Sequence, residues 1–247
     1  MSIRIGIAGW SISSAMARTL QLPATGTQLE RYATCFSAVE INTSFYRPHR
    51  RTTYMRWAAG VPSAFRFSVK MPRTITHERR LVDCQALIER FAGETDGLGD
   101  KRGPILVQFP PSFAYPGDIA VRFFHDLRAM FGGGIVVEPR HASWFQPMVD
   151  QMLTELRIAR VAADPARPHP AAQPGGWSGL AYFRLHGAPD IYKSRYTHEA
   201  VKAHAKVVAA LAARGTEVWT IYDNTTYGAA MQNGFELAEA CADLAGQ

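Results

Sequence analysis

The chain has 247 residues, of which 47% are hydrophobic, and this length and apolar content suit one globular domain with a sizeable core. Lysine and arginine total 27 against 21 aspartate and glutamate residues, so the net charge is +6, which is compatible with anionic ligands. The sequence has no basic tail of the kind that binds nucleic acid and no apolar segment typical of a signal peptide or membrane span, so we expect a cytoplasmic protein without membrane contact.

Eight short apolar runs are predicted to be strands, and most of them end at a charged, amide or imidazole side chain. They cover residues 3–7, 38–42, 65–70, 105–108, 135–140, 158–164, 180–186 and 218–224. Helical patterns separate most of these runs, at residues 28–37, 52–59, 83–91, 119–131, 145–156, 198–213 and 229–244. This alternation predicts an α/β fold, namely a TIM-like (β/α)8 barrel in a single domain over residues 1–247.

The connection between the sixth and seventh strands differs from the others. Four prolines and a Gly-Gly pair fall within residues 165–176. Proline removes a helix donor and glycine lowers helix propensity, so we predict an irregular Pro/Gly-rich crossover there.

Polar residues recur with period two at the strand ends, and side chains two apart share a face of a strand. The pattern groups Glu40 with Asn42, Ser68 with Lys70, Glu138 with Arg140, Tyr182 with Arg184 and His186, and Tyr222 with Asn224. Gln108 and Asp164 are expected to join them from the fourth and sixth strands. Because active sites of such barrels lie at the carboxyl ends of the strands, we predict a charge-balanced polar pocket there.

Motifs at these strand ends resemble the family called domain of unknown function 72, or YecE-like. They are GW at 9–10, VEIN at 39–42 with FY at 45–46, FSVK at 67–70 with ITH at 75–77, LVQFPP at 106–111, E-x-RH-x-SW at 138–144 and R-x-HG at 184–187. The resemblance implies a TIM-like barrel over nearly the whole chain and brings no established reaction. Pro139 departs from the usual family pattern and is expected to disturb the end of the fifth strand.

The candidate catalytic residues combine acids, a base and a cation. Glu138 and Glu40 are acid/base candidates, His186 is a candidate proton donor, and Lys70 is expected to stabilise charge rather than form a Schiff base. Candidate substrate-binding residues are Trp10, Asn42, Tyr46, His77, Gln108, Arg140, His141, Trp144, Arg184, Tyr192, Tyr196 and Asn224. Arginine pairs with phosphate or carboxylate, and aromatic rings stack on sugars or bases, although core packing explains each aromatic residue equally well when it is considered alone.

Metal binding is the alternative to acid/base chemistry without a cofactor. Glu138, Asp164, His186 and Asp223 end consecutive strands and offer oxygen and imidazole ligands. Arg140 and Arg184 would compete for these carboxylates, and no short histidine metal motif is present, so no cofactor is predicted.

Three functions therefore stay open. The first is a cofactor-independent hydrolase, isomerase or lyase acting on a small sugar- or nucleotide-like molecule that carries phosphate or carboxylate. The second is a divalent-metal-dependent phosphoesterase or isomerase. The third is a non-catalytic barrel that binds a nucleotide or nucleic acid through a basic, aromatic mouth.

Overall fold

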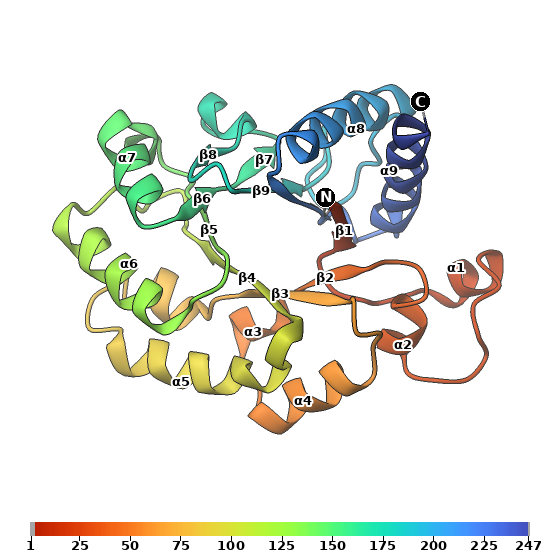
Figure 1. The fold of residues 1–247 in the computed structure, drawn as a ribbon, viewed down its shortest axis with the longest axis horizontal. Helices are drawn as coiled ribbons and strands as arrows, with labels where there is room; N and C mark the ends of the chain where they lie inside the picture. The colour runs from red at the N-terminus through yellow and green to blue at the C-terminus, as the bar shows by residue number, and fades with distance from the viewer. Residues whose placement is uncertain (1–2, 247) are drawn as a thin grey trace.

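Strands alternate with helices along most of the chain in the computed structural model, which describes residues 3–246 (Figure 1). The strands are β1 (Ile3–Ile7), β2 (Ala38–Ile41), β3 (Arg66–Lys70), β4 (Arg102–Gln108), β5 (Ile135–Glu138), β6 (Ile158–Arg160), β7 (Ala162–Asp164), β8 (Gly175–Gly176), β9 (Leu180–Leu185) and β10 (Glu217–Tyr222). The helices are α1 (Ser14–Thr19), α2 (Gln28–Tyr32), α3 (Thr43–Tyr46), α4 (Arg51–Ala59), α5 (Gln85–Thr95), α6 (Asp118–Met130), α7 (Pro147–Glu155), α8 (His198–Ala213) and α9 (Ala229–Ala245). Figure 1 shows the strands in the middle and the longer helices around them.

The strands form two sheets, in the orders β1-β10-β9-β7 and β2-β3-β4-β5-β6-β8. All pairs are parallel except β6 with the two-residue β8. The sheets approach each other at a bridge between Ala8 and Glu40, and again along residues 158–164, where β6 belongs to one sheet and β7 to the other. The fold is TIM-barrel-like, and closure of eight strands into one ring stays a prediction.

The predicted elements agree closely with the observed ones, with explicable differences. β5 ends at Glu138 and not at residue 140, because Pro139 has no N–H to continue the ladder. The sixth crossover contains only β8 and a short 3-10 turn at His169–Ala172 within the described residues, as its prolines predict. Helix α2 is shorter than predicted, and the short helices α1 and α3 were not predicted.

The interior between the strands is apolar below the polar strand ends. Trp219 packs nearly parallel to Tyr182, with 6.0 Å between ring centroids, and both belong to a buried cluster with Leu106, Val136 and Ile221. A Cβ at Gly103 would lie 2.6 Å from the Trp219 ring, so this glycine makes room for the indole. The polar site therefore lies above a tightly packed apolar interior.

No helix within residues 3–246 has the length and hydrophobicity that crossing a membrane requires.

Candidate functional site

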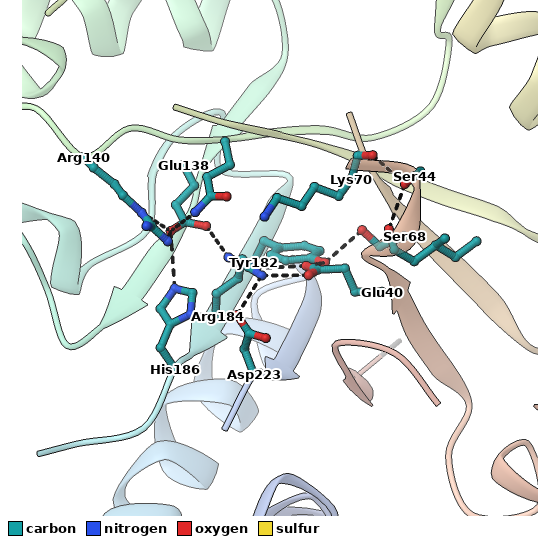
Figure 2. A network of polar contacts seen from close by, with 12 residues as sticks. Glu40, Ser44, Ser68, Lys70, Glu138, Arg140, Tyr182, Arg184, His186 and Asp223 are labelled. Atoms are coloured by element: carbon teal, nitrogen blue, oxygen red, sulfur yellow. Dashed lines mark hydrogen bonds and ion pairs between the residues drawn. The ribbon is translucent and has the colours of Figure 1, made fainter. Parts of the chain in front are cut away.

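Arg184 lies at the centre of the polar cluster and contacts carboxylates from three other strand ends (Figure 2). Its Nε and Nη2 donate to the two oxygens of Glu40 at 3.0 and 2.8 Å. Nη1 donates to Glu138 Oε2 at 2.6 Å, and Nη2 also donates to Asp223 Oδ2 at 3.1 Å. The side chain of Arg184 is only 1% exposed, so these three carboxylates neutralise a guanidinium that is almost fully removed from water.

Glu138 is held by a second arginine as well. Arg140 donates from Nε and Nη2 to Glu138 Oε1 at 3.0 and 2.8 Å, and Gln108 contacts the same oxygen at 3.4 Å. Burial alone would raise the pKa of Glu138, but the charges of Arg184 and Arg140 outweigh it and hold the pKa well below its usual range. Glu138 is therefore an anion at neutral pH, so of its predicted acid/base roles this state allows a base and opposes an acid.

His186 bridges two of the carboxylates. Its Nδ1 lies 3.0 Å from Asp223 Oδ2 and its Nε2 lies 3.3 Å from Glu138 Oε1. Burial alone would lower the pKa of His186, but the hydrogen bonds to Asp223 and Glu138 raise it. This geometry favours the imidazolium, and the role of His186 as a proton donor stays a prediction.

Glu40 receives a further hydrogen bond from the phenol of Tyr182. The Tyr182 hydroxyl donates to Glu40 Oε2 at 2.9 Å and contacts Ser68 Oγ at 2.8 Å. Burial raises the pKa of Tyr182, so the phenol keeps its proton. Tyr182 and Ser68 thus fix the orientation of Glu40 from below.

Lys70 differs from the other charged residues of the cluster. Its side chain extends from β3 toward Arg184 and Glu138 (Figure 2), yet Nζ makes no hydrogen bond or ion pair with any residue between 3 and 246. Nζ lies over the face of Phe45, 4.2 Å from the ring centroid. Burial and the Arg184 charge lower the pKa of Lys70 to about 8, against the opposing effect of the carboxylates.

A cavity of about 270 Å³ opens beside this cluster. Arg140, Arg167, His186 and Tyr192 provide its polar lining, together with Glu138. Its apolar lining is Pro111, Pro139, Ala163, Pro165 and Ile191. The cavity therefore combines cationic groups with flat apolar walls, as expected for a small anionic ligand with a ring or chain attached.

Two predicted members, Asp164 and Asn224, face away from the cluster. Asp164 lines a different cavity, against α8, with Phe183 and Leu185, the outward residues of β9. Asn224 is buried and donates to Ser194 O at 2.9 Å and Asn233 Oδ1 at 3.1 Å. On β10 the inward series is Trp219, Ile221 and Asp223, so the grouping of Tyr222 with Asn224 took the wrong face and Asp223 is the third carboxylate.

Of the predicted aromatic residues, Tyr192 lines the cavity with His186, whereas four others make their contacts elsewhere. Trp144 is fully buried, stacks on Phe109 at 4.6 Å and donates from its indole to Phe113 O at 2.8 Å. Trp10 packs edge-on against Trp57 at 5.0 Å, and Tyr46 is 74% exposed. Tyr196 accepts from Gly187 N and donates to Asp164 O, which fixes the loop after β9.

The remaining predicted binding residues are partly exposed beside the cluster. His77 contacts Thr76 Oγ1 through Nδ1 at 2.8 Å, and burial together with the charges of Lys70, Arg73 and Arg140 lowers its pKa to about 4. It is therefore neutral at pH 7. His141 contacts Ser143 Oγ through Nδ1 at 2.9 Å. Asn42 Oδ1 is buried without a hydrogen-bond partner among the described residues.

Ser44 and Phe45 are site residues that the strand pattern could not supply, because they follow β2 on the short helix α3. Ser44 Oγ donates to Ile41 O at 3.0 Å and to Lys70 O at 2.7 Å, which ties β2 to β3 behind the lysine. The FY of the 45–46 motif was the available signal for Phe45.

The described part of the chain has no group of three or more His, Cys, Asp or Glu side chains arranged to hold a metal. Of the four predicted ligands, Asp164 faces the outer cavity, while Glu138, His186 and Asp223 engage arginines or each other. These donors do not fit a metal centre as they are arranged.

A family profile described as "Protein of unknown function DUF72" matches residues 4–246. The UPF0759 protein YecE of Escherichia coli K12 is 32% identical over 155 residues, which are 60% of this chain and only 56% of that protein. The UPF0759 protein YunF of Bacillus subtilis is 24% identical over 268 residues, covering 96% of this chain and 94% of that protein.

Crystal structures of DUF72 family proteins show the same fold. The protein from Enterococcus faecalis V583 superimposes with a TM-score of 0.82 at 23% identity, over 97% of this chain and 95% of that chain. The protein from Thermotoga maritima MSB8 gives a TM-score of 0.79 at 23% identity, over 97% and 98% of the two chains.

Proposed function

This chain belongs to the DUF72 family, whose function is unknown. We propose that its strand-end site binds a small anionic molecule and converts it by acid/base chemistry without a cofactor. The substrate carries phosphate or carboxylate on a body the size of a sugar or nucleotide. The reaction is that of a hydrolase, isomerase or lyase, because no nucleotide-phosphate loop or dinucleotide motif appears in the sequence.

The observation that supports this most directly is the state of Arg140. Its Nε and Nη2 contact Glu138, whereas Nη1 has no hydrogen bond to a described residue, and the side chain is 28% exposed at the edge of the cavity. A guanidinium oriented by one carboxylate with a free N–H toward a cavity is suited to holding an anion. Arg167 lines the same cavity and adds a second cation.

His186 and His77 are the proton-transfer groups of this proposal. His186 has a raised pKa and supplies a proton, while His77 is neutral, and its Nε2 has no hydrogen-bond partner among the described residues. Glu138 and Glu40 act as fixed anions that hold Arg184 and stabilise the imidazolium. Lys70 belongs to the same polar cluster, and Asn42 Oδ1 has no hydrogen-bond partner among the described residues.

We also infer that the strands close into one eight-stranded barrel. Two contacts support closure: Gly9 N donates to Glu40 O at 2.9 Å between β1 and β2, and Val161 N donates to Val137 O at 2.9 Å where β6 gives way to β7. Closure explains why Glu40 of β2 and Arg184 of β9, which belong to different sheets, meet at hydrogen-bonding distance.

A thermal-shift screen with phosphate- and carboxylate-bearing metabolites tests the proposal. At least one class of anion is expected to stabilise the wild-type protein, and Arg140→Ala should abolish that stabilisation while leaving the fold intact. Arg214→Ala is the matched control, because Arg214 is exposed at the C-terminal end of α8. If the ligand stabilised Arg140→Ala as much as the wild type, the proposal that Arg140 binds the anion would be wrong.

A single-stranded oligonucleotide in the same screen separates catalysis on a small molecule from nucleic-acid binding. Affinity that falls steeply with salt would favour the binding alternative, because such binding depends on counterion release.

A further inference from the structure

Lys70 has no counterion among the described residues, because the carboxylates of the cluster pair with Arg184. All three carboxylates of the cluster contact Arg184, and two of them also contact Arg140 or His186. Lys70 is 8% exposed and forms no ion pair with any residue from 3 to 246. A buried ammonium without a partner is unfavourable, so the environment lowers the pKa of Lys70 and raises the fraction of free amine above that of an exposed lysine.

The surroundings of Lys70 also keep the amine available. Ser44 Oγ binds the Lys70 backbone carbonyl and not its nitrogen, and Phe45 offers only a ring face. The side chain is extended toward the polar cluster in Figure 2. The lysine nitrogen therefore points into the polar cluster, where it packs on the Phe45 ring and has no hydrogen-bond acceptor among residues 3–246.

We propose that Lys70 is a nucleophile that forms an iminium with an aldehyde or ketone carbonyl of the bound substrate. The inference rests on the proposed function, because it requires a substrate whose anionic group is held at Arg140 and whose carbonyl extends from the cavity to Lys70 in the same polar cluster. It revises the expectation that Lys70 only stabilises charge.

The step balances without any further reagent. The neutral amine adds to the carbonyl carbon, forming a C–N bond as the C=O π bond breaks, and one proton passes from the nitrogen to the oxygen to give a neutral carbinolamine. Loss of that hydroxyl as water, with one more proton from solvent, gives the iminium. Its positive charge replaces that of the ammonium, and Glu138 and Glu40 lie in the same cluster.

An iminium withdraws electrons from the neighbouring carbon and so assists proton removal, carbon–carbon cleavage or loss of carboxylate. Within the three reaction classes above, this selects an isomerase or lyase over a hydrolase.

Reductive trapping on the intact protein tests the inference. The chain has lysine only at positions 70, 101, 193, 202 and 206, so peptide mass spectrometry resolves every possible adduct. Lys193, Lys202 and Lys206 are exposed, and Lys101 donates to two backbone carbonyls, so these four are internal controls. The probe is glyoxylate with cyanoborohydride, since glyoxylate combines an aldehyde with a carboxylate, and formaldehyde serves as the anion-free counterpart.

We expect glyoxylate to label Lys70 well ahead of the exposed lysines near pH 7, adding the mass of the probe less one oxygen atom. The Lys70 labelling rate should reach half its maximum near pH 8, where its pKa lies, while the exposed lysines need higher pH. Labelling of Lys70 no faster than that of Lys193 with either probe would overturn the inference.

The two probes also distinguish the failure of this inference from the failure of the proposed function. Preferential labelling of Lys70 by formaldehyde, with no advantage for glyoxylate and no effect of Arg140→Ala, would keep the nucleophile and remove the anion clamp. Anion stabilisation lost in Arg140→Ala, with Lys70 unlabelled by both probes, would keep the clamp and remove the nucleophile.

Discussion

At the scale of single residues, one buried arginine is neutralised from three directions. Removing one partner of a buried ion pair is costly because the remaining charges stay in a medium that solvates them poorly. Arg184 has three such partners, so its loss would leave Glu40, Glu138 and Asp223 facing one another.

We therefore expect Arg184→Met to lower the free energy of unfolding by about 3 to 5 kcal/mol or to prevent folding. Urea denaturation followed by circular dichroism measures this. Arg140→Met is the control and should lower the free energy of unfolding much less. Arg140 is partly exposed, and Glu138 still pairs with Arg184 in this variant. Equal losses in the two variants would show that Arg184 is not the centre of the network.

The cluster also predicts how stability depends on pH. The folded pKa of His186 is raised above its usual 6.5, so its contribution is complete below pH 6.5 and is lost as pH rises through the folded value. The folded pKa values of Glu138 and Asp223 are lowered from 4.5 and 3.8, so their contributions are complete above those values and are lost on acidification.

The difference in melting temperature between the wild type and His186→Gln should thus be largest between about pH 4.5 and 6.5 and shrink toward pH 9. A difference that grows with pH would contradict the imidazolium assigned here.

Lys70 should behave in the opposite way. Because the folded state disfavours its charge, Lys70→Met is expected to raise the free energy of unfolding by about 1 kcal/mol at neutral pH. The gain should fade between pH 8 and 10.5, the folded and ordinary pKa values of Lys70. Thermal unfolding against pH measures this, and a destabilised Lys70→Met at pH 7 would mean that the ammonium has a favourable partner.

Sequence periodicity predicted most of the charged cluster but not every face. Glu40, Lys70, Glu138, Arg184 and His186 fell on the correct side because their strands are regular. Asp164 and Asn224 did not. Each lies at the end of a strand whose inward face carries an apolar residue, Val161 or Ile221, and a search for pairs of polar residues misses that face. The third carboxylate, Asp223, was recognised only as a possible metal ligand.

At the scale of elements, the loop after β9 is attached to the last helix by side-chain amides. Asn224 contacts Ser194 O and Asn233 Oδ1, and Asn233 contacts both N and O of Tyr196. This loop carries Ile191 and Tyr192, which line the cavity beside Arg140. No strand or helix pattern predicts such a tether, because it depends on two amides from different elements.

Asn224→Ala should therefore loosen the loop without unfolding the protein. We expect the free energy of unfolding to fall by about 1 to 2 kcal/mol, because Ser194 O and Asn233 Oδ1 each lose a hydrogen bond from Asn224. Amide hydrogen exchange should become faster mainly in residues 187–196. Hydrogen exchange read by mass spectrometry is the measurement. A loop whose exchange does not change would show that Tyr196 and Asn233 hold it alone.

At the scale of the whole molecule, β1 and β2, which belong to different sheets, lie close together beside Gly6. A Cβ at Gly6 would lie 2.4 Å from the carbonyl oxygen of Ala38, which is backbone and cannot rotate away. The close approach of β1 and β2 therefore requires glycine at this position.

Gly6→Ala is expected to cost about 1 to 3 kcal/mol, the usual range for overpacking, in a denaturant titration. Gly93→Ala is the matched control: it lies in α5 with no atom within 4 Å of the added Cβ, so it should stabilise by about 0.5 to 1 kcal/mol. A neutral Gly6→Ala would mean that β1 can move away from β2 without loss.

The contacts of Arg184 also span the chain: Glu40 is 144 residues away in sequence, and Glu138 is 46. Both of these acids precede the Pro/Gly-rich crossover, whereas their guanidinium follows it. A nascent chain that ends at the crossover thus holds two interior acids, of which Glu138 can pair with Arg140 but Glu40 has no arginine partner yet. The acids before the crossover and the arginine after it neutralise each other. Two fragments produced by a split at the crossover should therefore each be unstable alone and should fold when they are mixed.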